Sequence, residues 1–181
     1  MLINAKTSQV LLIDIQSKLA PAIADNAAVS QAAAWVLQVA RLCEVPVLAT
    51  EQYPKGLGHI LPALQELIPA AAIFEKIHFS ALREAVIADA IAANTRPQVI
   101  VLGTETHVCV LQSVLDLIKA GYQVFVVSEA VGSRTAENKQ LALNRMQQAG
   151  AVIISQEMLA FEWLEKAGTE LFRQISKGWI R

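Results

Sequence analysis

The chain has few charged residues, which make up 17% of its 181 positions, and only two cysteines. Two cysteines do not make a disulfide framework, and no Cys-x-x-Cys pair is present, so we predict a reducing, cytoplasmic location. The formal net charge is −1 and no basic run occurs, so nucleic acid is not an expected partner. We also expect no secretory signal and no membrane span, because the N-terminus lacks a basic and apolar leader pattern and no uncharged stretch is long enough.

Motifs for phosphate and metal binding are absent as well. The sequence has no Gly-x-Gly-x-x-Gly and no Gly-Lys-Ser/Thr loop. His59, His78 and His107 are scattered and show none of the usual metal-ligand spacings. We therefore expect no metal and no other cofactor.

What the chain has in abundance is apolar side chains, at 54% of residues. A chain of this length is expected to form one domain, residues 1–181, with a full core. A monomer would have difficulty hiding so much apolar surface, so we predict a homo-oligomer. The candidate contact residues lie in the C-terminal segment: Phe161, Trp163, Leu164, Phe172 and Trp179.

Short β-branched runs alternate with longer helical patterns, which predicts βαβ units. The expected strands are residues 9–15, 46–50, 71–76, 98–102, 123–127 and 151–154. The expected helices are residues 27–43, 81–94, 108–120 and 136–149, followed by one on each side of Gly168. The predicted fold is α/β: a three-layer α/β/α Rossmann-like fold with a six-stranded, mainly parallel sheet.

Polar side chains stand at the ends of several expected strands. Asp14 ends the first, Lys76 ends the third, and the loop after the fourth leads to Cys109. In such sheets ligands bind beyond the carboxyl ends of the strands, so these residues should converge on one rim.

Each of these residues has two interpretations. Cys109 follows the loop after a predicted strand and stands at a predicted helix start, where free amides and the helix dipole favour a thiolate near neutral pH. It could equally be a buried apolar cysteine, the interpretation that suits Cys43. Asp14 could cap a turn or act as a general base for the thiol. Lys76 could be a surface charge or could hold carboxylate and thiolate ionised.

His107 lies two positions before Cys109, which is poor geometry for a Cys–His dyad. We interpret His107 as a wall or subunit-contact residue. Glu75 should point to the opposite face from Lys76, because side chains alternate along a strand.

Taken in order and spacing, these motifs resemble the isochorismatase-like cysteine hydrolases. The resemblance is carried by residues 11–16 (LLIDIQ), by Lys76 with Phe79 and Ser80, and by residues 103–110 (GTETHVCV). Residues 50–58 (TEQYPKGLG) resemble the branch named isochorismatase domain-containing proteins. The likeness extends over nearly the whole chain, from Val10 to about Leu171.

The resemblance implies a catalytic triad of Asp14, Lys76 and Cys109. It also implies a non-proline cis peptide between Thr104 and Glu105, which would turn the Glu105 amide towards the Cys109 amide to form an oxyanion hole. Nicotinamide amidases of this superfamily carry Asp-x-His after the second strand, whereas this chain has Glu51-Gln52-Tyr53. Nicotinamidase activity and zinc are therefore not expected.

The expected function is a metal-free cysteine hydrolase that cleaves a small amide-like C–N bond through a Cys109 thioester. The expected partner is a small-molecule substrate, in a pocket with these walls: Ile15, Gln16, Tyr53, Leu57, Phe79 and Glu105. Two alternatives stay open. One is a thiol-redox enzyme on the same fold, although no resolving cysteine is in sequence reach. The other is a catalytically silent interaction protein.

Overall fold

The computed structural model describes residues 1–179, with the side chain of Trp179 outside the described part. Six strands form one sheet in the order β3-β2-β1-β4-β5-β6. Every neighbouring pair is parallel. The strands are β1 (Ser8–Ile13), β2 (Val47–Gln52), β3 (Ile73–Lys76), β4 (Gln98–Thr104), β5 (Gln123–Gly132) and β6 (Val152–Ile154). The predicted α/β fold with six strands is confirmed, and the named strands of the sheet are parallel throughout.

The predicted helices are found close to their expected positions. They are α1 (Asn26–Leu42), α4 (Ala85–Ala93), α5 (Leu111–Lys119), α6 (Ala136–Gln148), α7 (Gln156–Leu164) and α8 (Glu170–Trp179). Two short helices, α2 (Pro54–Leu57) and α3 (Pro62–Gln65), lie between β2 and β3, where the sequence predicts no helix. Each of them begins at a proline, whose fixed φ suits the first helical position.

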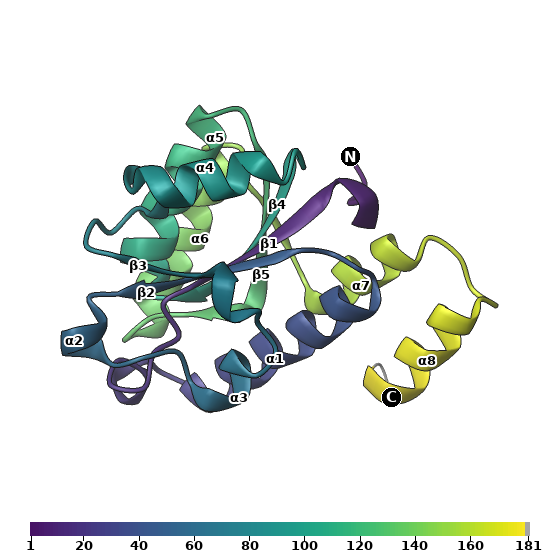
Figure 1. Ribbon diagram of the computed structural model, residues 1–181, viewed down its shortest axis with the longest axis horizontal. Coiled ribbons are helices and arrows are strands. Elements are labelled where there is room, and N and C mark those ends of the chain that lie inside the picture. Colours follow the sequence, from purple (N-terminus) through teal and green to yellow (C-terminus); the bar gives the residue numbers. More distant parts are fainter. Residues whose placement is uncertain (180–181) are drawn as a thin grey trace.

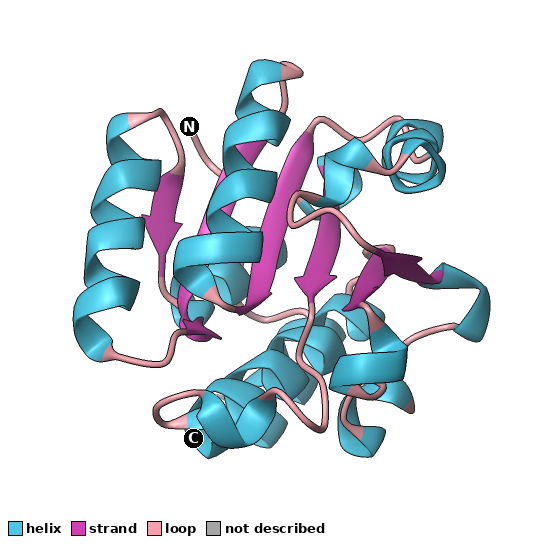
Figure 2. Cartoon of the chain, turned by 90° about the vertical axis from the view of Figure 1, so that its left-hand side faces the viewer, coloured by secondary structure: helices cyan, strands magenta, loops and turns pink. Residues whose placement is uncertain are grey.

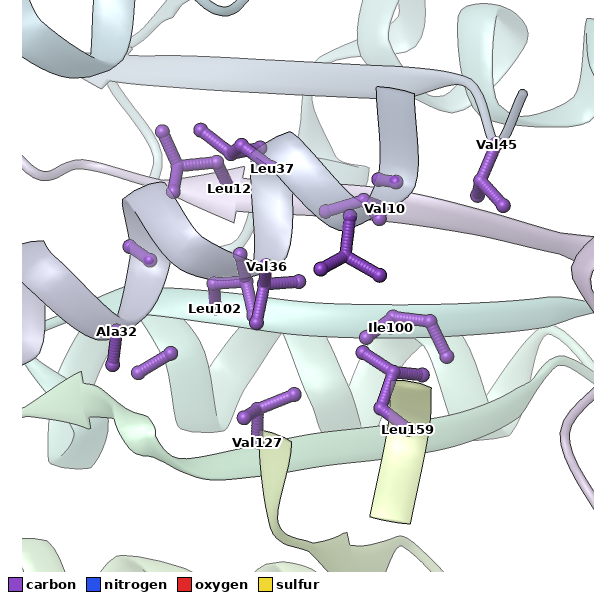
Figure 3. Close-up of a cluster of buried hydrophobic side chains, with 14 of the residues drawn as sticks. Val10, Leu12, Ala32, Val36, Leu37, Val45, Ile100, Leu102, Val127 and Leu159 are labelled. Atoms are coloured by element: carbon purple, nitrogen blue, oxygen red, sulfur yellow. The ribbon is translucent and has the colours of Figure 1, made fainter. Parts of the chain in front are cut away.

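Helices cover both faces of the sheet, as Figures 1 and 2 show, and the strand residues alternate between the two faces. In β1, Val10 and Leu12 pack against α1, while Leu11 and Ile13 pack in a second cluster with α4, α5 and α6. Figure 3 shows the first cluster, in which Val36 of α1 lies between the strands and the helix. Burying one such aliphatic side chain contributes about 1.5–3 kcal/mol, so the two-residue period fixes the register of each strand.

The C-terminal helices use their apolar side chains within the chain itself. Trp163 and Leu164 are buried against the first cluster, and the Trp163 indole donates to Ser8 Oγ at 3.2 Å. Their predicted role in subunit contact is therefore wrong, because this face of α7 packs on the sheet. Phe161 remains half-exposed, and Phe172 packs partly on the core. The expected contact by the Trp179 side chain lies outside the described part.

The two central strands, β1 and β4, approach each other closely at their carboxyl ends. Gly103 pairs with Ile13 and has a φ of 144°, and a Cβ there would overlap the Ile13 carbonyl oxygen. Glycine is thus required where β4 turns towards Cys109. Across residues 1–179, no helix is long and apolar enough to cross a bilayer.

Candidate active site

Asp14 follows the last residue of β1 and is held from both neighbouring strands. Its amide donates to the Thr50 carbonyl of β2 at 3.1 Å, and the Thr50 hydroxyl donates to Asp14 Oδ1 at 2.7 Å. The Thr104 hydroxyl of β4 donates to the Asp14 carbonyl at 2.6 Å. The side chain of Asp14 is fully buried at the carboxyl end of β1. Its position is therefore set by the sheet rather than by a loop.

Lys76 ends the edge strand β3 and reaches Asp14 across β2. Its Nζ lies 2.7 Å from Asp14 Oδ2, and both side chains have no exposed surface. The ammonium donates to Gln52 Oε1 at 2.6 Å, to the Phe79 carbonyl at 3.0 Å and to the His78 carbonyl at 3.3 Å. A buried ammonium needs such partners, because an unpaired charge in the interior is costly.

The Asp14 carboxylate contacts both other groups of the site. Its Oδ2 is 2.7 Å from the Lys76 ammonium, whose other contacts are Gln52, His78 and Phe79, and the carboxylate lies within hydrogen-bonding reach of the Cys109 thiol. Burial raises the pKa of Asp14, and the nearby Lys76, Thr50 and Cys109 groups lower it in part. Asp14 is therefore a stronger base than an exposed aspartate.

Cys109 lies in a π-helical turn, Thr106–Val110, directly before α5. Its sulfur is 4.0 Å from Gln52 Oε1 and within hydrogen-bonding reach of Asp14 and Lys76. Burial raises the pKa of the thiol to about 12, and the Asp14 charge adds to this effect while Lys76 opposes it. The predicted thiolate at neutral pH is therefore wrong. The thiol is only 4% exposed, so loss of water and a neighbouring carboxylate outweigh the helix end.

The loop between β4 and Cys109 turns at Glu105. Within residues 1–179 every peptide bond is trans, so the cis bond implied between Thr104 and Glu105 is wrong. The chain instead reverses through a left-handed Glu105, with a φ of 54° and a ψ of 65°. Asp14 after β1 and Tyr53 after β2 also have positive φ, at 54° and 40°. Such strained residues gather at functional sites, where surrounding contacts hold them.

The residues expected to line the pocket lie in different environments. Ile15 is buried in the α1-side cluster, and Gln16 is buried with its side chain bound to the Gln52 amide and the Gly58 carbonyl. Both are as buried as Asp14, Lys76 and Cys109. Tyr53 and Phe79 are half-exposed, and Leu57 is partly exposed. Glu105 is buried, and its carboxylate is bound by Arg134.

A cavity of about 240 Å³ lies beside the site. Tyr53 is the one expected wall residue among those that line it, and Cys109 is not among them. Its walls are Tyr53, Pro54, Lys55, Glu75, Lys76, Ile77 and Glu84. This volume is below the range of about 300–1,000 Å³ that is usual for ligand pockets.

Several residues of the site were missed in the sequence. Thr50 and Gln52 stand two apart at the end of β2, and strand alternation places them on one face, towards Asp14 and Lys76. The period-two pattern was the signal that could have found them. Thr104 and Arg134 act through tertiary contacts that no local pattern indicates.

Glu51, which points the other way, stands where nicotinamide amidases of this superfamily carry the metal motif that this chain lacks. Its carboxylate contacts the His59 ring at 2.9 Å and accepts from the Ile60 amide at 2.7 Å. Among the described residues there is no group of three or more His, Cys, Asp or Glu side chains arranged to hold a metal ion. The carboxylate thus anchors the loop after α2 to β2.

Comparison with known proteins shows the family to which the chain belongs. Residues 8–158 match the Isochorismatase domain family, and the chain belongs to this family. It is 36% identical to isochorismatase family protein 1B of Dictyostelium discoideum over 94% of this chain and 84% of that protein. It is 37% identical to isochorismatase domain-containing protein 2A of Mus musculus over 95% of this chain and 82% of that protein. The resemblance seen in the motifs is confirmed.

Solved structures agree with the assignment. The structure of the MAR1 ribonuclease from Caenorhabditis elegans has a TM-score of 0.93 at 32% identity, over 100% of this chain and 93% of that one. YcaC from Pseudomonas aeruginosa, with hexane-2,5-diol and covalent acrylamide, has a TM-score of 0.91 at 25% identity, over 98% and 91%. The octameric YcaC hydrolase of unknown specificity from Escherichia coli has a TM-score of 0.88 at 25% identity, over 92% and 83%. Membership of this family indicates a hydrolase.

A surface carboxylate controls the turn that holds Lys76. Glu84 Oε1 accepts from the Ile77 amide at 2.9 Å, from the His78 amide at 3.1 Å and contacts the His78 ring at 2.9 Å. These bonds fix the segment whose carbonyls accept from Lys76. They also lower the pKa of Glu84 to about 2, the Ile77 amide having the largest effect.

Glu84→Gln should therefore lower the free energy of unfolding at pH 7, by about 1 kcal/mol for the charge-assisted bonds that it loses. Because the folded-state pKa lies below the ordinary value near 4.5, this stabilisation is present above pH 4.5 and disappears as the pH falls towards 2. Urea unfolding of both proteins from pH 7 to pH 2 measures the difference. A difference that stays constant over this range would contradict the assignment.

Proposed function

We propose that the chain is a metal-free cysteine hydrolase that cleaves a small amide-like C–N bond through a thioester on Cys109. The observation that carries the proposal is the fully buried ion pair between Asp14 and Lys76 beside the Cys109 thiol. A buried charge pair is an expensive feature for stability alone. A carboxylate and an ammonium from separate segments beside one thiol are the arrangement that nucleophilic catalysis needs.

The reaction begins with proton transfer. Asp14 takes the proton of Cys109, and the sulfur attacks the substrate carbonyl carbon, so that a C–S bond forms and the oxygen becomes an oxyanion. The C–N bond then breaks, and the leaving nitrogen takes the proton from Asp14. Because the thiol pKa is about 12, the proton must leave as the sulfur attacks, and the raised pKa of Asp14 suits this role.

Water completes the cycle. Asp14 takes a proton from the water that attacks the thioester, the C–S bond breaks, and Cys109 recovers its proton as the carboxylic acid departs. Lys76 keeps its positive charge throughout and stabilises whichever of Asp14 and Cys109 is anionic. We propose the amides of Glu105 and Cys109 as the donors to the oxyanion, with the left-handed turn at Glu105 in place of the cis bond, and one such donor is worth about 10²–10³ in rate.

The comparisons support this proposal in part. The Pseudomonas aeruginosa neighbour holds a covalent acrylamide, a compound that adds to nucleophiles through its C=C bond, and the Escherichia coli neighbour is described as a hydrolase. The Caenorhabditis elegans neighbour is described as a ribonuclease. We do not extend that activity to this chain, because its net charge of −1 and lack of basic runs do not favour RNA.

The structure gives less support to a redox enzyme. Redox-sensing cysteines have a low pKa and are accessible, whereas Cys109 is buried with a raised pKa. A silent interaction protein would have no use for a buried ion pair that costs stability, so we favour the hydrolase over it as well.

Exposed apolar side chains support assembly into a homo-oligomer in the cytoplasm. Ile77 and Phe79, beside the site, are 67% and 52% exposed, and Phe161 on α7 is 47% exposed. The Escherichia coli neighbour is octameric. We propose that copies of this chain cover these side chains in each other, because exposed apolar groups next to a site favour association.

Replacing the nucleophile tests the function directly. Cys109→Ala should reduce amine release from a panel of small amides by at least about 10³-fold, because no thioester can form. Its free energy of unfolding should change by about 1 kcal/mol or less. Cys43→Ala is the matched control and should keep full activity, because Cys43 packs on the core away from the proposed chemistry. Turnover retained by Cys109→Ala would refute the mechanism.

The pH profile tests the base. Activity should rise with an apparent pKa above the ordinary aspartate range and stay high through neutral pH, because Asp14 must be ionised while the thiol holds its proton. Asp14→Asn should lower the rate at pH 7 by about 10²–10⁴ and remove the acid limb. Steady-state rates from pH 4 to pH 9 measure this. An acid limb that persists in Asp14→Asn assigns the base to another group.

Light scattering on purified protein tests assembly. The expected particle mass is a multiple, greater than one, of the 19.6 kDa chain mass. A single species at the mass of one chain, at micromolar concentration, would be evidence against the oligomer.

A further inference from the structure

Glu105 stands in an unfavourable conformation at the point where the proposed mechanism needs an amide donor. It lies between the end of β4 and the π turn that contains Cys109, with positive φ and ψ. This conformation is unfavourable for a residue with a Cβ. A contact from outside the loop can offset this cost and keep the Glu105 peptide in place.

That contact is an arginine from a distant segment. Arg134 follows β5, and its Nε and Nη2 donate to Glu105 Oε1 and Oε2, each at 2.9 Å. The two parallel bonds form a fork that fixes direction as well as distance. The Glu105 side chain is 7% exposed, while that of Arg134 is 62% exposed. His107 lies near the same carboxylate, with Nε2 at 3.9 Å from Oε2.

The asymmetry in burial gives this pair more weight than an ordinary surface ion pair. Exposed ion pairs contribute little, because water replaces either partner. Here loss of the arginine would leave a buried carboxylate without its partner, and the carboxylate would have to move towards water. Glu105 is the residue that turns the chain, so its backbone would move with it.

We propose that Arg134 is a positioning residue that holds the Glu105 peptide amide against the acyl oxygen in the thioester-forming step. This inference rests on the proposed function. Arg134 touches neither the sulfur nor a reacting atom in this scheme, and it acts through Glu105. The groups with the largest effects on the Cys109 pKa are Asp14 and Lys76, so loss of Arg134 should change geometry more than thiol acidity.

Two reagents separate these effects on the full chain. With p-nitrophenyl acetate, the sulfur attacks a carbonyl, an oxyanion forms and p-nitrophenolate leaves. With iodoacetamide, the sulfur displaces iodide from a saturated carbon and no oxyanion forms. The ratio of the two rate constants at Cys109 therefore reports the oxyanion donors alone. A Cys43→Ala background with mass spectrometry confines both reactions to Cys109.

The expected result is a change in this ratio. Arg134→Gln should lower the acylation rate about tenfold or more, because small displacements of a catalytic group have large effects, and should leave alkylation within about twofold. Arg134→Lys should be intermediate, because an ammonium cannot form the fork. The matched control is Arg83→Gln. Arg83 is 65% exposed and pairs with Asp116 at 3.0 Å, so the same substitution there should leave the ratio unchanged.

Other outcomes overturn the inference. An unchanged ratio in Arg134→Gln, or an equal loss of both rates, would mean that Arg134 only supports the fold. If Arg134→Gln does not fold, Glu105→Gln is measured instead. This variant leaves no buried charge unpaired, and its amide cannot accept from both Arg134 donors. An unchanged ratio of the two rates in Glu105→Gln would also contradict the inference. A wild-type protein that is not acylated at Cys109 overturns the proposed function itself. If the wild-type protein is acylated at Cys109 and the variants have the same rate ratio, only the role of Arg134 is overturned.

Discussion

The contact between Asp14 and Lys76 is the interaction on which the site depends. Two opposite charges meet at 2.7 Å with no exposed surface, two strands apart in the sheet. Neither charge could be buried alone, so each element that ends at this rim contributes a partner. Thr50 and Thr104 hold the aspartate, while Gln52 and the carbonyls of His78 and Phe79 hold the ammonium. The sheet order brings these partners together, and the electrostatic cost of burial explains why so many are present.

The same burial decides the chemistry of the sulfur. A thiol at a helix start is expected to ionise easily, yet here water is excluded and a carboxylate lies close by, so the thiol keeps its proton. Burial therefore makes Asp14 more basic and Cys109 less acidic. In the proposed mechanism, proton transfer between them is coupled to attack on a substrate. A protonated thiol is also less open to oxidation than a thiolate.

Much of the fold could be predicted because parallel strands leave a plain pattern. Residues such as Val10 and Leu11 are buried on opposite faces, so strands read as apolar runs, and helices such as α1 follow with small and aliphatic residues. The site was predicted less completely. Asp14 and Lys76 stand at strand ends and Cys109 follows the loop after a strand, and they are visible for that reason. The structure places Ile15 in the core and Gln16 in a hydrogen-bond network, contacts that their position beside Asp14 does not indicate.

The amino-acid sequence by itself determined the order of strands and helices and the residue types that reach the rim, because hydrophobic period and chain interruptions are local properties. The trans peptide and left-handed turn at Glu105, the raised pKa of the thiol and the fork from Arg134 were decided only by the tertiary structure. Each of these depends on groups that distant parts of the chain bring close: packed helices that exclude water, a carboxylate at the end of the neighbouring strand β1, or a guanidinium 29 positions further on. Local patterns carry no record of such neighbours.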